Sequence, residues 1–125
     1  MIAYRVCCET TFEAAHYLPG YDGPCKNMHG HTWRARLHFE GQKLNEQGML
    51  IDFRVVKSTI RTAFDHRILN DVLPVTPTAE HVAQYILEHF CSMFLDRVPF
   101  SCQCYKVELW ETPNNKVTVE VDDYV

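Results

Sequence analysis

The stretch HGHTWRARLHFE, residues 29–40, alternates between apolar and polar positions. Extended as a strand, it would place His29, His31, Trp33, Ala35, Leu37 and Phe39 on one face, and Thr32, Arg34, Arg36, His38 and Glu40 on the other. Successive side chains of a strand point to opposite faces, so this period predicts a strand with one face buried in the core. The two histidines extend the apolar face and would therefore point the same way.

The other elements are predicted from hydrophobic period and from turn-forming residues. In chain order we expect strands over 2–12 and 29–40, helices over 52–64 and 78–95, and strands over 104–111 and 116–121, with a loop over 19–24. The first helix would have Asp52 as its N-cap and would carry Phe53, Val56, Ile60 and Phe64 along one side. The order ββααββ predicts an α+β fold, with an antiparallel sheet and both helices packed on one face.

Length and composition limit the classes of protein to consider. The 125 residues suffice for one domain, spanning 1–125, and 46% of them are hydrophobic, which is enough for one core. A net charge of −4 argues against nucleic-acid and membrane partners. The first residues lack a signal-peptide pattern, so we expect a cytoplasmic protein. Its cysteines would then be reduced thiols: Cys7, Cys8, Cys25, Cys91, Cys102 and Cys104.

Three histidines are the strongest candidates for a metal site. His29 and His31 continue an apolar face, where an imidazole is costly unless it has a partner, and His16 precedes them in the chain. Three neutral imidazoles that meet at one point form a tetrahedral zinc site with its fourth position open, as in catalytic zinc centres. We therefore predict Zn²⁺ bound by these three residues. The other histidines, His38, His81 and His89, are assigned structural roles.

Cys25 has two chemical interpretations. It lies four residues before His29, close enough to act as a fourth zinc ligand or as a free thiolate beside the metal. A fourth ligand would close the site and make it structural, as in a non-catalytic, zinc-stabilised interaction domain. A free thiolate would be a base or a nucleophile. The spacing alone leaves both interpretations open.

Two further positions carry acidic groups of interest. Glu111 continues the face that Tyr105, Val107 and Leu109 would share, where a carboxylate needs a partner. A solvated position at the end of the strand is an equal alternative. Asp65 and His66 could together transfer protons, although the side chains of adjacent residues seldom hydrogen-bond each other well.

Six short motifs occur in order along the chain: Phe12-Glu13-Ala14-Ala15-His16, Cys25-x-x-x-His29-Gly30-His31, Met49-Leu50-Ile51-Asp52-Phe53, Asp65-His66-Arg67-Ile68-Leu69-Asn70, Pro77-Thr78-Ala79-Glu80 and Glu111-Thr112. In combination they resemble the 6-pyruvoyl-tetrahydropterin synthase / 6-carboxytetrahydropterin synthase family over nearly the whole chain. The resemblance implies the tunnelling fold, a ββααββ unit that assembles into an oligomeric barrel. It also implies a homo-oligomer, usually a hexamer built as a dimer of trimers.

The resemblance implies roles for the candidate residues. Zinc would be bound by His16, His29 and His31, and Cys25 would be the base that removes a proton. Asp65 and His66 would form a proton relay, usually with the cysteine of another subunit. Glu111 would anchor the pterin ring of the substrate, 7,8-dihydroneopterin triphosphate.

The product is a separate question. Compactness and the motif Met49-x-Ile51-Asp52-Phe53 resemble the bacterial 6-carboxytetrahydropterin synthases of queuosine and 7-deazapurine biosynthesis. These enzymes release acetaldehyde and triphosphate. The pyruvoyl synthases have the same zinc ligands and relay but retain the substrate's side chain, so their activity is the alternative. The basic residues available to bind triphosphate are Lys26, Arg34, Arg36, Arg54, Lys57, Arg61 and Arg67, and the sequence does not choose among them.

Overall fold

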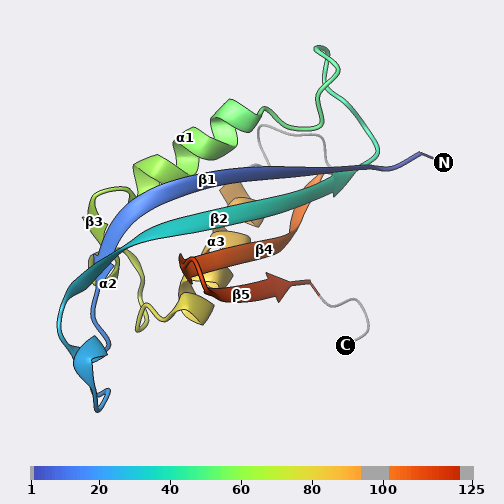
Figure 1. Ribbon diagram of the computed structural model, residues 1–125. Helices are drawn as coiled ribbons and strands as arrows, with labels where there is room; N and C mark the ends of the chain where they lie inside the picture. Colours follow the sequence, from blue (N-terminus) through green and yellow to red (C-terminus); the bar gives the residue numbers. More distant parts are fainter. Residues whose placement is uncertain (1, 94–101, 122–125) are drawn as a thin grey trace.

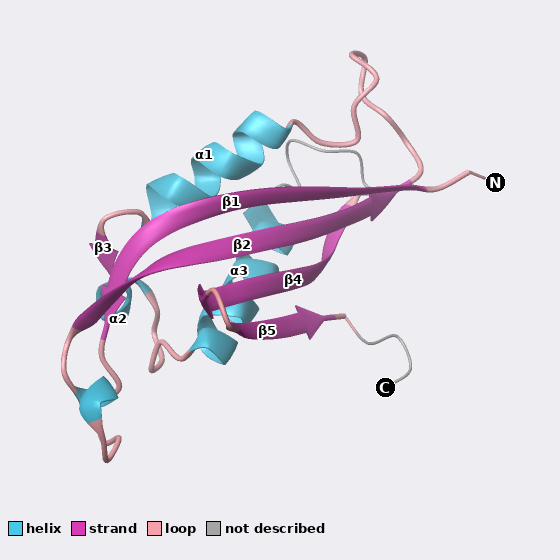
Figure 2. Cartoon of the chain, viewed as in Figure 1, coloured by secondary structure: helices cyan, strands magenta, loops and turns pink. Residues whose placement is uncertain are grey.

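The computed structural model describes residues 2–93 and 102–121 (Figure 1). Five strands form one sheet in the order β3-β1-β2-β4-β5. The strands are β1 (Tyr4–His16), β2 (His29–Gly41), β3 (Arg67–Ile68), β4 (Gln103–Thr112) and β5 (Asn115–Glu120). The helices are the 3-10 turn η1 (Pro24–Lys26), α1 (Phe53–Phe64), α2 (Leu69–Val72) and α3 (Ala79–Met93), shown in cyan in Figure 2.

The long hairpin of β1 and β2 organises the sheet. Its antiparallel register runs without interruption from the pair Tyr4–Gly41 to the pair His16–His29. Strand β1 thus continues four residues beyond the predicted end at Phe12. Ala14 and Ala15 are poor strand formers, and pairing with β2 keeps this segment extended in spite of its local preference.

The four long strands are antiparallel, as predicted, but the sheet as a whole is mixed. Strand β3 pairs parallel to β1, with Arg67 opposite Ala14 and Ile68 opposite Ala15. The sequence analysis missed both β3 and the four-residue helix α2, because elements this short display no hydrophobic period. The sheet of one chain is open, with β3 and β5 at its edges.

One core lies between the sheet and the two long helices. The face of β2 that was predicted to be buried is buried at Trp33, Ala35, Leu37 and Phe39. The same cluster contains Val56, Ile60 and Phe64 from α1 and Val82, Ile86 and Phe90 from α3. Both helices therefore cover one face of the sheet, which confirms that prediction.

The first predicted helix needs one correction, at its start. Asp52 is the N-cap of α1, as expected, because its carboxylate accepts a hydrogen bond of 2.9 Å from the backbone N–H of Arg54. Phe53, however, is 45% exposed rather than buried, because it occupies the first position of the helix, beyond the edge of the core. The predicted end of the second helix, residues 94–95, lies outside the described residues. No helix in the described ranges is long and apolar enough to span a membrane.

Strand β4 departs from the predicted alternation at two bulges. Cys104 pairs with Phe39 and Lys106 with His38, so Tyr105 is an extra residue in this register. The bulge buries Cys104 and turns Tyr105 toward the opposite face, against the His38 ring. The prediction that Tyr105 shares the core face is therefore wrong. Val107 and Leu109 are buried as predicted.

The second bulge lies at Glu111. Trp110 pairs with Lys116 and Thr112 with Asn115, which leaves Glu111 without a partner in the β4–β5 register. A bulge bends its strand and redirects the side chain of the extra residue. Here it turns a carboxylate toward the ends of β1 and β2.

Candidate functional site

The three predicted metal ligands converge at one end of the β1–β2 hairpin. His16 ends β1 directly opposite His29, and His31 lies two residues further along β2 on the same face. Their ring centroids are 4.5 Å (His16–His29), 4.9 Å (His29–His31) and 5.3 Å (His16–His31) apart. One nitrogen from each ring lies within 4.8 Å of the others, a spacing that a single metal ion can bridge.

Backbone carbonyls orient two of these rings. The Nδ1 atom of His16 lies 2.8 Å from the carbonyl oxygen of Pro77, and that of His29 lies 2.8 Å from the carbonyl oxygen of Asn27. Since a carbonyl only accepts, each Nδ1 carries a proton, and in the neutral form of each ring the free lone pair is then on Nε2. Metal-binding histidines are usually held by such a bond from their second nitrogen.

The buried Nε2 atoms of His16 and His31 have no hydrogen-bond partner among the described residues. His16 is only 1% exposed, so water does not readily satisfy it. A buried polar atom left without a partner costs about 1–3 kcal/mol. Burial also lowers the pKa of His31 below its usual value, and the neighbouring His16 and His29 add to this, while Glu111 opposes it. Neutral imidazoles with free lone pairs are the form that binds a metal, so these residues fit a zinc ion.

Glu111 faces this cluster. Its carboxylate lies 3.4 Å from Nε2 of His31 and 4.0 Å from Nε2 of His16, although neither contact has hydrogen-bonding geometry. Its side chain is 27% exposed. The partly buried position, rather than a solvated strand end, is the one that the structure shows.

Cys25 lies in the turn η1, within the loop that joins β1 to β2. This loop folds back on itself through a hydrogen bond of 2.8 Å from the N–H of Leu18 to the carbonyl oxygen of Cys25. Cys25 is a free, half-buried thiol. Within the described part of the chain, the group of mutually close ligand atoms contains three imidazoles and not this thiol. The arrangement gives no support to Cys25 as a fourth ligand, and its role stays a prediction.

The side chains of Asp65 and His66 contact each other at the C-terminal end of α1. Oδ2 of Asp65 lies 3.1 Å from Nδ1 of His66, so the adjacent side chains do meet, contrary to the expectation for neighbours. The reason is the backbone of His66, whose φ of 57° lies in the left-handed region. Its N–H donates to the carbonyl oxygen of Glu13 at 2.6 Å, and this bond to β1 holds the unusual conformation.

The Asp65 carboxylate is kept ionised by its surroundings. A hydrogen bond from the backbone N–H of Glu13, at 2.8 Å, is the main cause that lowers its pKa below the usual value. The hydrogen bond from His66 and the charge of Arg61 lower it further, while burial opposes them. An ionised Asp65 fixes the Nδ1–H tautomer of His66 and leaves Nε2 of a 79% exposed ring available to a proton.

The left-handed conformation of His66 predicts an unusual stability pattern. Left-handed backbone costs an L-residue roughly 1–2 kcal/mol, and glycine avoids that cost. We expect His66→Gly to be more stable than His66→Ala by about 1 kcal/mol, with both variants lacking the imidazole. Urea unfolding of the two variants checks this. Equal stabilities would show that the backbone at this position is not held in the left-handed region.

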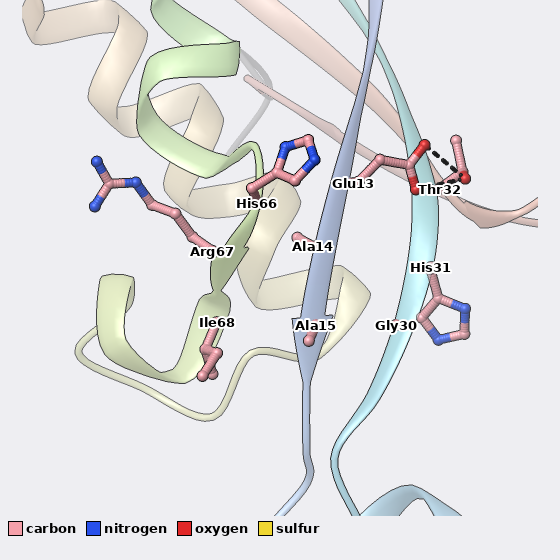
Figure 3. A pocket seen from close by; sticks show the side chains of 9 residues that line it. All are labelled: Glu13, Ala14, Ala15, Gly30, His31, Thr32, His66, Arg67 and Ile68. Atoms are coloured by element: carbon pink, nitrogen blue, oxygen red, sulfur yellow. Dashed lines mark hydrogen bonds between the residues drawn. The ribbon is translucent and has the colours of Figure 1, made fainter.

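Two pockets adjoin the cluster and share Gly30, His31 and Thr32. One, of about 450 Å³, is also lined by Glu13, Ala14, Ala15, His66, Arg67 and Ile68 (Figure 3). The other, of about 570 Å³, is also lined by Thr11, Arg34, Trp110, Glu111, Thr112 and Pro113. In Figure 3, β1 lies between His66 and His31. His66 and His31 thus line the first of these pockets from opposite sides of β1.

Sequence reasoning missed several groups that hold these residues. The backbone of Glu13 bonds to both Asp65 and His66, and its carboxylate accepts from the hydroxyl of Thr32 at 2.8 Å. Backbone groups carry no signal in a sequence. Arg61 could have been found, because it lies four residues before Asp65 on a predicted helix, the spacing of a helical ion pair.

Comparison with known proteins identifies relatives. Residues 5–122 match the family model described as 6-pyruvoyl tetrahydropterin synthase. The 6-carboxy-5,6,7,8-tetrahydropterin synthase of Synechocystis sp. is 39% identical over 87 residues, which cover 62% of this chain and 67% of that protein. The protein of the same name from Bacillus subtilis is 32% identical over 110 residues, which cover 82% and 75%. A structure of Caenorhabditis elegans 6-pyruvoyl tetrahydropterin synthase aligns with a TM-score of 0.77 and 27% identity, and covers 98% of each chain.

Proposed function

The chain belongs to the 6-pyruvoyl tetrahydropterin synthase family, and from this membership we propose that it is a zinc-dependent lyase. It converts 7,8-dihydroneopterin triphosphate to 6-carboxy-5,6,7,8-tetrahydropterin and releases acetaldehyde and triphosphate. The observation that carries the proposal is the convergence of three imidazoles, two of them with buried and unpartnered Nε2 atoms. The names of the Synechocystis and Bacillus relatives favour the carboxy product.

Each residue of the site has a task in this proposal. His16, His29 and His31 hold the zinc, which when bound supplies a Lewis acid for the hydroxyls of the substrate's side chain. Glu111 lies beside them, where its carboxylate can accept two N–H bonds from the guanidine-like edge of a pterin. The carboxylate thereby orients the ring so that its side chain points at the imidazoles.

Proton transfers are assigned to the thiol and the relay. The Cys25 thiolate removes a proton from the substrate's side chain. The ionised Asp65 holds His66 so that Nε2 exchanges protons with the reacting groups. The family resemblance implies that the relay serves a site completed by a neighbouring subunit, and we propose the same here; within one chain, His66 and His31 line one pocket from opposite sides of β1.

Assembly and cellular role complete the proposal. The sheet of one chain is open at β3 and β5, which supports a barrel closed by several copies, proposed as a hexamer of two trimers. The enzyme is proposed to act in the cytoplasm, in queuosine or 7-deazapurine biosynthesis. Light scattering of the purified protein tests the hexamer, and a monomer at working concentrations would contradict it.

Identification of the products by mass spectrometry tests the activity. Incubation of the zinc-loaded protein with 7,8-dihydroneopterin triphosphate is expected to yield acetaldehyde, triphosphate and 6-carboxy-5,6,7,8-tetrahydropterin. A pterin that retains the three-carbon side chain as a pyruvoyl group would favour the alternative activity, which the description of the family and the name of the Caenorhabditis structure support. Unchanged substrate would contradict both.

A further inference from the structure

Arg61 connects helix α1 to strand β1 beside the Asp65–His66 pair. Its Nη1 donates to the carbonyl oxygen of Thr11 on β1 at 2.8 Å, and its Nη2 donates to Oδ2 of Asp65 at 3.0 Å. Its side chain is 50% exposed, so the guanidinium reaches these acceptors along the surface of the molecule. One side chain thus fixes the carboxylate relative to the strand.

The carboxylate of Asp65 has three donors around it. Oδ1 accepts from the backbone N–H of Glu13, and Oδ2 is shared by Nη2 of Arg61 and Nδ1 of His66. Without Arg61, Oδ2 would keep only the exposed imidazole of His66, and the carboxylate could turn about its remaining bond to Glu13. The imidazole would then lose the orientation that points Nε2 away from Asp65.

We propose that Arg61 is a positioning residue, which holds the Asp65–His66 pair in its working geometry by bridging the carboxylate to β1. The inference rests on the proposed role of this pair as a proton relay. Arginine suits the task because its rigid planar fork makes two directed bonds at once, whereas the ammonium of lysine is a point charge on a flexible chain.

Two charged or titratable side chains face Asp65, the guanidinium of Arg61 from α1 and the imidazole of His66. Strand β1 contributes the backbone N–H of Glu13, whose own carboxylate bonds to Thr32 instead. Among these, the positive charge of Arg61 helps to lower the pKa of Asp65. Removal of this charge raises the pKa of Asp65, so protonation of the carboxylate and loss of activity in acid should both begin at a higher pH.

The test compares Arg61→Gln and Arg61→Lys with Arg5→Gln. Arg5 is a largely exposed arginine on β1, its Nε lies 3.5 Å from the carboxylate of Glu40, and it is outside the set of basic residues considered for triphosphate. In Arg61→Gln we expect kcat to fall about 10- to 100-fold, as for a misplaced catalytic group, with KM changed less than about twofold. The acidic limb of the pH–rate profile should move to higher pH. Arg5→Gln should show neither change.

Two NMR measurements examine the Asp65–His66 pair independently of enzyme activity, and the lysine variant separates the effect of the Arg61 charge from that of its geometry. Carbon-13 NMR follows the titration of the Asp65 carboxyl, and nitrogen-15 NMR reports the His66 tautomer, both without turnover. In Arg61→Lys the pKa of Asp65 should stay below its usual value, and kcat should lie between those of Arg61→Gln and the wild type. If the wild-type protein has no activity, the proposed function fails, while the NMR measurements still decide whether Arg61 holds the pair.

Three results would overturn the inference. The first is an unchanged Asp65 titration and His66 tautomer in Arg61→Gln. The second is a shifted titration with kcat unaltered in an active enzyme. The third is an equal loss of kcat in Arg5→Gln. If Arg61→Gln does not fold, Arg61→Lys decides the matter, because full kcat in that variant would contradict a role for the guanidinium fork.

Discussion

Replacing Cys25 with alanine is expected to abolish turnover of 7,8-dihydroneopterin triphosphate while the fold and the bound zinc remain. The thiol lies in the turn η1 and is not among the mutually close metal-ligand atoms of the described chain. Loss of a general base typically lowers the rate about 10²- to 10⁴-fold. Single-turnover kinetics and metal analysis of the same preparation measure both quantities.

The opposite outcome would support the rival role of Cys25 as a fourth zinc ligand. In that case Cys25→Ala would lose metal and unfold, because structural zinc contributes directly to folding. Cys7→Ala is the matched control, since Cys7 is an exposed thiol on β1, far along the strand from His16. Full activity in Cys25→Ala would contradict the proposed mechanism altogether.

Removal of zinc is expected to have the second large effect. A chelator should abolish activity and lower the unfolding temperature, because a ligand that binds only the folded state at 1,000 times its Kd stabilises that state by about 4 kcal/mol. For a domain of this size we expect a decrease of more than about 10 °C. Activity and calorimetry before and after chelation, and after zinc is restored, measure the effect.

Two histidine variants sharpen this experiment. His16→Ala removes a proposed zinc ligand, whose ring bonds to the carbonyl oxygen of Pro77, and the unfolding temperature of this variant should no longer respond to a chelator. His81→Ala removes a ring bonded to the carbonyl oxygen of Thr76, outside the cluster, and should respond as the wild type does. A wild-type protein that keeps its activity and its unfolding temperature after the metal is removed would contradict a zinc-dependent site.

Much of the fold could be predicted because the spacing of apolar residues along the chain indicates which side chains are buried. The alternation of residues 29–40 correctly placed Trp33, Ala35, Leu37 and Phe39 in the core. The same reasoning went wrong at Tyr105, because a bulge in β4 depends on its pairing with β2. A bulge adds one residue to one strand, and the alternation of apolar and polar residues in that strand does not indicate where the extra residue lies.

The candidate site, too, could be predicted from the sequence only in part. His29 and His31 could be assigned to one face from their spacing, and the motif order suggested the partners. The meeting of Asp65 with His66 could not be predicted, because it needs a left-handed residue held by the carbonyl oxygen of Glu13, more than fifty positions earlier in the chain.

By itself the sequence determined which side chains share a face, where the long elements lie, and which residue types are available for zinc and for proton transfer. Only the tertiary structure decided that His16 lies opposite His29, that Glu111 turns toward them, and that Arg61 ties Asp65 to β1. The physical reason is the range of the interactions. Hydrophobic period is a local property, whereas strand register, bulges and side-chain bridges are set by contacts between residues distant in the chain.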